Sequence, residues 1–102
     1  MLASFSAAGI LAQSVGGVVT DQSGAVMPHV RIELRDAGRG LVRAAETDAT
    51  GYYAISSVPA ASYLFTANAN LFLPFEMTQL KLEAGTSRRL DVVMKVDRKS
   101  VV

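Results

Sequence analysis

The segment "TDATGYYAISSVPAASY" (residues 47–63) reads as a turn, a strand, a second turn and the start of another strand. Asp48 can accept hydrogen bonds from the backbone ahead of it, and Gly51 can take a positive φ, so the chain can reverse here. The alternation of side chains predicts a set that points into a core: Tyr53, Ile55, Val58 and Tyr63. The segment contains no Cys, no His and no carboxylate cluster. We therefore interpret it as architecture, two strands of a small β-sandwich.

Turn signals recur along the rest of the chain roughly every eight to twelve residues, the spacing of an all-β sandwich. Val30, Ile32 and Leu34 alternate with charged residues, which predicts a half-buried strand. Residues 75–83 change phase midway, and a β-bulge near Thr78 or Gln79 would reconcile the two halves. The sequence predicts about seven strands and no convincing helix, at residues 15–21, 30–36, 41–47, 52–58, 62–69, 75–83 and 88–96.

Four arginines recur at every fourth position from Arg31 to Arg43, which on a helix would form a basic stripe. Gly38 and Gly40 lie inside this span and would weaken a helix. Val30, Ile32 and Leu34, which alternate with the charged residues from Arg31 to Arg35, repeat with period two. We therefore expect strands here.

The composition limits the kinds of partner and chemistry that the chain can have. The chain has 102 residues, enough for one small domain, of which 50% are hydrophobic and 19% charged. Its formal net charge of +1 provides no general field for nucleic acid, and its basic pairs lack an aromatic stacking platform, so no nucleic-acid partner is expected. The absence of Cys excludes disulfides and thiolate chemistry.

The first segment, residues 1–14, is apolar, rich in Ala and Ser and uncharged. It is too short for a transmembrane helix, and no such helix is expected in this chain. It is typical of the apolar and cleavage regions of a signal peptide that lacks its basic start, with cleavage near Gln13 to Val15. The alternative is an apolar tail or an extra edge strand. We expect an exported protein, with a domain over residues 15–96 and a linker or following segment starting at 97–102.

Several motifs together resemble the carboxypeptidase regulatory-like domain family. They are "GVVTDQSG", "PHVRI", "TDATGYY", "VPAASY" and "LDVVM", with matches at Gly17, Val19, Asp21, Gly24, Pro28, Ile32, Thr47, Asp48, Gly51, Tyr53, Val58, Pro59, Tyr63, Leu90, Asp91, Val92 and Met94. The resemblance covers about residues 15 to 96. It implies a seven-stranded, Greek-key-type β-sandwich, similar to transthyretin (prealbumin). In this family the domain is an accessory, found beside metallocarboxypeptidase domains, in surface proteins and at the periplasmic N-terminus of TonB-dependent outer-membrane receptors. A signal-like segment followed directly by the domain looks most like the receptor arrangement.

Three glycines of the family pattern are replaced here, by His29, Ala61 and Leu71. Glycine at such sites usually supplies a positive φ. We expect these positions either to be strained or, at Ala61, to use another type of turn.

Candidate catalytic chemistry is sparse. His29 is the sole imidazole, and neither Ser6 nor the Ser56–Ser57 pair has the partners of a catalytic triad. Four aspartates could gather at the ends of a sandwich and bind Ca²⁺, but turn formation is the favoured role: Asp21, Asp36, Asp48 and Asp97. No Gly-rich phosphate loop is present. We expect no catalytic residue, no cofactor and no metal, and hence no enzyme; a hydrolase of the transthyretin-like type would be expected to need several histidines.

An apolar cluster surrounds Pro74, made of Leu71, Phe72, Leu73 and Phe75. It either folds back onto the core or forms an exposed patch that docks a partner. Tyr52, which faces opposite to Tyr53, is the best candidate for stacking on a sugar. We expect a structural or docking module whose partner is a downstream domain of the same protein or an envelope protein. The alternative is a free-standing secreted module that binds carbohydrate or peptide.

Overall fold

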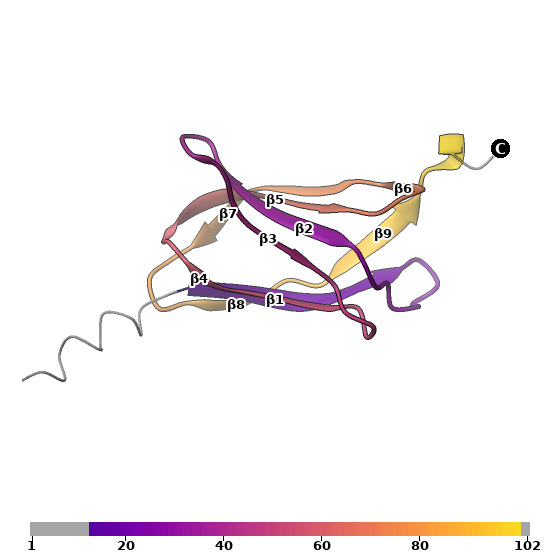
Figure 1. Ribbon diagram of the computed structural model, residues 1–102, viewed down its shortest axis with the longest axis horizontal. Coiled ribbons are helices and arrows are strands. Elements are labelled where there is room, and N and C mark those ends of the chain that lie inside the picture. Colours follow the sequence, from indigo (N-terminus) through magenta and orange to yellow (C-terminus); the bar gives the residue numbers. More distant parts are fainter. Residues whose placement is uncertain (1–12, 101–102) are drawn as a thin grey trace, which may run out of the picture.

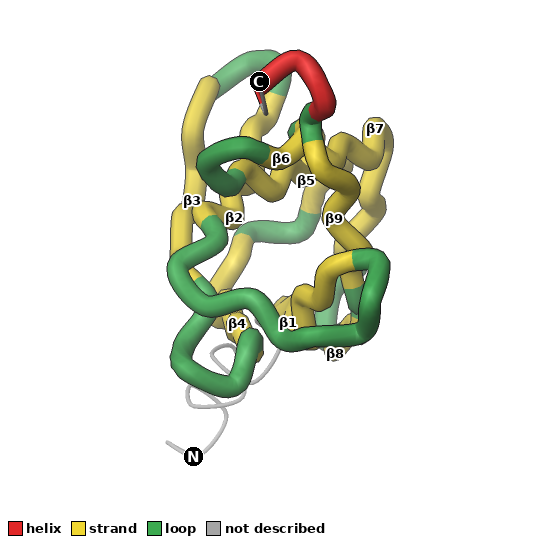
Figure 2. Tube along the Cα trace, turned by 90° about the vertical axis from the view of Figure 1, so that its right-hand side faces the viewer, coloured by secondary structure: helices red, strands yellow, loops and turns green. Residues whose placement is uncertain are grey.

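The computed structural model describes residues 13–100 as two β-sheets packed face to face (Figure 1). The first sheet has the order β4-β1-β9-β6, with β8 also paired to β1: β1 Gln13–Asp21, β4 Tyr52–Val58, β6 Phe72–Leu73, β8 Ser87–Arg89 and β9 Val92–Val96. The second sheet has the order β3-β2-β5-β7: β2 Arg31–Asp36, β3 Gly40–Glu46, β5 Ala61–Asn68 and β7 Phe75–Leu82. In Figure 2, β4, β1 and β8 of the first sheet lie below β2 and β5 of the second, whereas β9 and β6 of the first sheet lie at the height of β2 and β5. The expected all-β sandwich is confirmed.

The expected count of about seven strands was wrong, because the described residues form nine. The last predicted strand is divided into β8 and β9. The two-residue β6 is additional, and Pro74 separates it from β7, where the chain crosses from the first sheet to the second. A bilayer-crossing helix is absent from residues 13–100, whose helical structure is a single 3₁₀ turn at Arg98–Ser100.

The core lies between the sheets and is built from the inward side chains of both. Its apolar members are Val15, Val19, Val30, Ile32, Leu34, Tyr53, Ile55, Val58, Tyr63, Phe65, Ala67, Leu80, Leu82, Val92 and Met94. The side chains expected inside from residues 47–63 are all among them. The two buried tyrosine hydroxyls donate to carbonyls, Tyr53 to Leu90 O and Tyr63 to Pro59 O, each at 2.5 Å. Burial raises the pKa of Tyr53 well above its usual range.

In β7 and β4, a β-bulge inserts one extra residue, so that the apolar side chains on both sides of it point into the core. Between the pairs Tyr63↔Leu80 and Phe65↔Met77, β7 has one more residue than β5, and Gln79 has φ 57°, so the bulge expected at this point is confirmed. A second bulge, at Ser57 with φ 57°, was not expected. In a regular strand, residues three apart face opposite sides. The extra residue at this bulge explains why Ile55 and Val58 both point inward.

Two of the replaced glycine positions keep the glycine-like backbone. His29 has φ 65° and Leu71 has φ 73°, both in the left-handed region. Ala61 does not have a positive φ and begins β5, so this turn is of another type, one of the two expected outcomes.

β8 and β9 act as one strand parallel to β1, interrupted at Leu90 and Asp91. The register is constant on both sides of this break, since Ser87 pairs with Ser14 and Val92 with Val19. Within the break, Leu90 N donates to Gly16 O at 2.9 Å. Val18 N donates to the Asp91 carboxylate at 2.8 Å, so a side chain replaces the missing backbone acceptor. This bond holds the pKa of Asp91 below its usual range.

Candidate functional site

The five residues singled out from the sequence divide into three groups. Phe72 and Phe75 are half-buried and pack against the core, with the Phe75 ring edge-on to Phe65 at 6.0 Å. Leu71 is 51% exposed on the turn before β6. Leu73 and Tyr52, 46% and 44% exposed, lie on the same side of the first sheet by strand register, although they belong to its opposite edge strands. The apolar cluster around Pro74 is thus partly core and partly surface.

Register places Leu73 and Tyr52 on the outer surface of the first sheet, which we call outer face I. Tyr52 pairs with Val18 of β1, and Thr20 of β1 pairs with Val93 of β9. Two residues further along β9, Lys95 pairs with Leu73 of β6. Because paired residues and residues two apart share a face, these side chains form a diagonal band across the sheet. Val93 is 52% exposed, and Val26, bridged to Thr20, is 47% exposed.

Outer face I carries few charges. Its outward residues are Ser14, Gly16, Val18, Thr20, Tyr52, Ala54, Ser56, Leu73, Ser87, Arg89, Asp91, Val93 and Lys95. Arg89 and Asp91 pair with each other, with Nε 3.1 Å from Oδ1. Lys95 is the remaining charge. The face is therefore largely apolar or hydroxylated.

The outer surface of the second sheet differs sharply. Paired positions place six charged side chains on it: Arg31, Glu33, Arg35, Glu46, Glu76 and Lys81. Glu33 accepts from Arg31 at 3.0 Å and from Arg35 at 2.9 Å, and the bond from Arg31 is the first cause of its lowered pKa. The arginine repeat noted in the sequence thus belongs partly to this solvated, ion-paired face. Such a surface is typical of a sheet that faces water.

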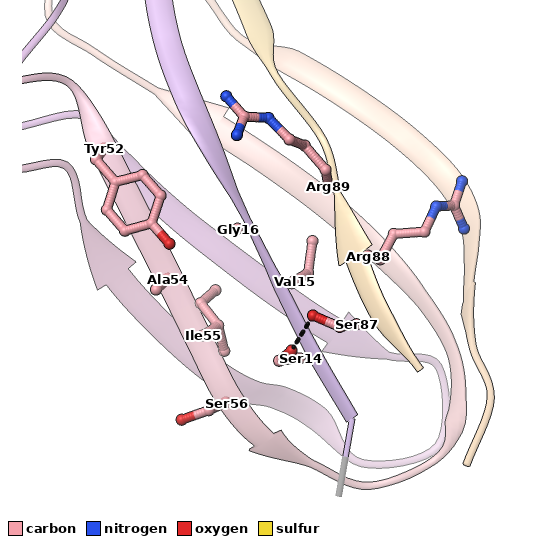
Figure 3. A pocket seen from close by; sticks show the side chains of 10 residues that line it. All are labelled: Ser14, Val15, Gly16, Tyr52, Ala54, Ile55, Ser56, Ser87, Arg88 and Arg89. Atoms are coloured by element: carbon pink, nitrogen blue, oxygen red, sulfur yellow. Dashed lines mark hydrogen bonds between the residues drawn. The ribbon is translucent and has the colours of Figure 1, made fainter. Parts of the chain in front are cut away.

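One end of outer face I is hollowed into a groove of about 400 Å³ (Figure 3). Tyr52 borders a floor of small residues that includes Gly16, Ala54 and Ser56. A Cβ at Gly16 would lie 3.3 Å from the Tyr52 hydroxyl, so the tyrosine extends across β1. Ser14 and Ser87 share a hydrogen bond of 3.1 Å, and the Arg88 side chain points away from Tyr52. The groove offers an aromatic ring and hydroxyl groups.

The other end of outer face I has two hollows on either side of Leu73 and Lys95. One, about 290 Å³, is lined by Leu73, Pro74, Phe75, Glu76, Val93 and Lys95. The other, about 370 Å³, is lined by Gln22, Leu73, Lys95, Val96, Asp97, Arg98 and Lys99. Leu73 and Lys95 line both and form a ridge between them. Leu73 could be singled out from the sequence as part of an apolar cluster. Val93 and Lys95 could not, because their pairing with distant strands decides their surroundings.

The four aspartates considered for Ca²⁺ each make local hydrogen bonds. Asp48 Oδ1 accepts from Thr50 N at 2.9 Å and from the Thr50 hydroxyl at 2.7 Å, and the hydroxyl is the first cause of its lowered pKa. Asp21 binds Ser23 in the same way, Asp36 Oδ1 accepts from Gly38 N, and Asp97 Oδ1 accepts from Lys99 N. No group of three or more His, Cys, Asp or Glu side chains arranged for a metal ion occurs within residues 13–100. These carboxylates shape turns.

The candidate catalytic groups do not come together. The His29 side chain is 85% exposed, with Nδ1 3.8 Å from Glu46 Oε1. Ser56 lies on outer face I, in the first sheet, and Ser6 lies outside the described residues. His29, at a turn before β2 of the second sheet, and Ser56 therefore do not form a nucleophile–base pair.

Comparison with known proteins agrees with this geometry. The family model described as "Carboxypeptidase regulatory-like domain" matches residues 14–95. No curated protein matches the sequence. Among solved structures, the Bacillus anthracis TIE protein superposes with a TM-score of 0.69 at 17% identity, over 84% of this chain and 17% of that one.

Two further structures show how widely the fold is used. A candidate carbohydrate-binding protein from Bacteroides uniformis has a TM-score of 0.65 at 23% identity, over 80% of this chain and 40% of that one. Catechol 1,2-dioxygenase from Acinetobacter sp. ADP1 has a TM-score of 0.65 at 10% identity, over 88% of this chain and 54% of that one. The chain thus spans between 17% and 54% of these proteins, and the likeness shows the fold alone.

Proposed function

We propose that this chain, which belongs to the carboxypeptidase regulatory-like domain family, is a non-catalytic accessory module that docks a protein surface through outer face I. We further propose that it is the periplasmic N-terminal part of a TonB-dependent receptor-like protein. The partner would be a downstream domain of the same protein or another envelope protein.

The contrast between the two outer faces carries the proposal. The second sheet carries six charged residues and one comparably exposed apolar side chain, Leu41, whereas outer face I presents Tyr52, Val26, Leu73 and Val93, each between 44% and 52% exposed. Among the described residues, Lys95 is the single unpaired charge on outer face I. A sheet face with so few charges resembles the side of a sheet that another surface covers. Contiguous apolar surface of this kind often marks an interface.

The polar groups support a non-catalytic role. The lowered pKa values of Asp21, Asp36 and Asp48 arise first from hydrogen bonds within their own turns. Such groups stabilise loops, and their shifts do not indicate a reactive cleft. The exposed His29 has the surroundings of a surface turn.

Export is part of the proposal. The signal prediction for residues 1–14 falls mainly on residues 1–12, which lie outside the described residues, while Gln13 and Ser14 begin β1. Gln13 is buried, its Nε2 donates to Val58 O at 2.5 Å, and its Oε1 accepts from Gly85 N at 2.8 Å. Cleavage before Gln13 keeps both bonds in the folded product, and we expect N-terminal sequencing of the exported protein to find a start near Gln13 to Val15. An intact Met1 in a cytoplasmic fraction would contradict export.

The size and location of the native product test the receptor context. An epitope tag in the exposed turn at residues 37–39 allows the protein to be followed in soluble and membrane fractions. A membrane-associated band much larger than 10.8 kDa would support the receptor-like context. A soluble band of about this mass would refute it and favour a free-standing module.

The groove beside Tyr52 favours the second candidate, a secreted module that binds carbohydrate or peptide. An exposed aromatic ring above small and hydroxylated residues can stack on a sugar. Titration with a panel of soluble oligosaccharides, followed by tyrosine fluorescence, should then give saturation that Tyr52→Ala abolishes. A flat titration across the panel, with the fold intact, would exclude the sugar form of this candidate.

A further inference from the structure

The two hollows beside the ridge of Leu73 and Lys95 can receive side chains from another surface. The hollows measure about 290 and 370 Å³, and the exposed Val93 and Val96 each line one of them. A concave site of this kind can accept side chains inserted from another surface. Leu73 would lie between two inserted side chains and lose its exposure to water.

The charges around the ridge are unequal. Lys95, Arg98 and Lys99 line the larger hollow, and within residues 13–100 none of them forms an ion pair. Asp97 also lines it, with its carboxylate accepting from Lys99 N at 3.0 Å, so three cations and one carboxylate surround this hollow. Glu76 is the carboxylate of the smaller hollow. The surface around Leu73 is therefore apolar and the larger hollow beside it is cationic, in a chain whose net charge is only +1.

We propose that this ridge binds an acidic, apolar polypeptide segment, which inserts apolar side chains into the two hollows and places carboxylates near Lys95, Arg98 and Lys99. The inference rests on the proposed docking function and specifies the chemistry of the partner. The apolar contacts supply most of the affinity, while the charges select the partner and orient it.

Two other occupants fit less well. A second copy of this chain docked ridge to ridge would bring the same three cations against themselves, and like charges across an interface are unfavourable. An anionic membrane would attract the cations, but a lipid surface has no side chains for two hollows separated by a ridge. A polypeptide satisfies both the shape and the charge.

Nuclear magnetic resonance on the full chain tests the proposal. Two synthetic amphipathic peptides of equal length and equal leucine content are compared, one with glutamates and the other with lysines at the polar positions. We expect the glutamate peptide to shift the amide signals of Leu73, Val93, Lys95 and Val96, with an affinity that falls as salt is raised. Equal binding of both peptides, or no binding of either, would overturn the proposal.

Two variants separate shape from charge. Leu73→Ser, at a position already 46% exposed, should weaken binding of the glutamate peptide about tenfold while the domain stays folded. Lys95→Glu should weaken it about fivefold and improve binding of the lysine peptide. Lys81→Glu on the second sheet, where the side chain is 69% exposed, is the matched control and should change neither. A Lys95→Glu variant that binds like the unchanged chain would refute the electrostatic part.

Two further measurements distinguish this inference from the docking function on which it rests. In the first, the unchanged chain and Lys95→Glu are mixed with vesicles that contain phosphatidylglycerol. If the unchanged chain binds the vesicles, Lys95→Glu does not, and neither peptide binds, the ridge contacts a membrane and the inference is overturned. A photo-reactive residue at Val93 in cells should cross-link a protein through outer face I. A cross-link that Lys95→Glu leaves unchanged would refute acidic recognition but keep docking, whereas the absence of any cross-link at Val93 would count against docking itself.

Discussion

Gly17 of β1 faces the carbonyl group of Leu90 at the break between β8 and β9. An alanine at this position should force β1 away from the break. A Cβ atom at this position would lie 2.2 Å from Leu90 O and 2.7 Å from its carbonyl carbon. Both are backbone atoms, so no side-chain rotation can relieve the overlap. The strand itself must move.

The expected loss follows from the bonds that fix the break. Tyr53 Oη donates to Leu90 O, Leu90 N donates to Gly16 O, and Val18 N donates to the Asp91 carboxylate. Each such bond contributes about 1 kcal/mol to the free energy of unfolding. We therefore predict that Gly17→Ala lowers this free energy by about 2 to 4 kcal/mol. The free energy of unfolding of a small domain is only about 5 to 15 kcal/mol in total.

Urea denaturation at neutral pH measures the change, because the free energy of unfolding falls linearly with denaturant concentration. Gly38→Ala is the matched control, since its Cβ would meet only Asp36 Oδ1 at 3.6 Å, and it should stay within about 0.5 kcal/mol of the unchanged chain. Tyr53→Phe keeps the space and removes one bond, so it should cost about 1 kcal/mol. A Gly17→Ala variant as stable as Gly38→Ala would refute this account of the break.

Three further predictions concern other parts of the fold. Leu71→Gly should raise the free energy of unfolding by about 0.5 to 1 kcal/mol in urea titrations, because Leu71 has φ 73°, whereas Ala61→Gly within β5 should lower it by a similar amount. The pKa of Asp48 is lowered in the folded state from 3.8, so its contribution is present above about pH 4 and is lost as pH falls through the lower folded value; Asp48→Asn should show less loss of urea midpoint between pH 7 and pH 3 than the unchanged chain. Phe75→Ala, which removes the ring packed on Phe65, should lower the melting temperature clearly, whereas Leu73→Ala at an exposed site should lower it little, and equal effects would contradict the assignment of one to core and the other to surface.

Local patterns allowed most of the strands to be predicted. The alternation of Val30, Ile32 and Leu34 identified an inward face, because a strand buried on one side repeats every two residues. The change of phase before Leu80 located the bulge at Gln79. Such features are readable because their causes lie within a few residues.

Features with long-range causes could not be predicted in the same way. The break at Leu90 depends on the close approach of Gly17, far away in the sequence, and the splitting of the last strand was therefore missed. The same limit applies to the candidate site. Tyr52 and Leu73 were both singled out, but only the registers of β1, β9 and β6 place them on one face with Val93.

The parallel pairing of β1 with β8 and β9 also has a kinetic consequence. Ser14 and Ser87, hydrogen-bonded neighbours in the sheet, are 73 positions apart in the chain. The central strand of the first sheet therefore cannot acquire its parallel neighbour until nearly all of the domain has emerged from the ribosome or from an export channel. Contacts this distant in sequence slow folding, since the entropy of closing the loop is lost before any contact energy is gained. A chain that delays its own folding in this way stays unfolded for longer, which would suit the export proposed above.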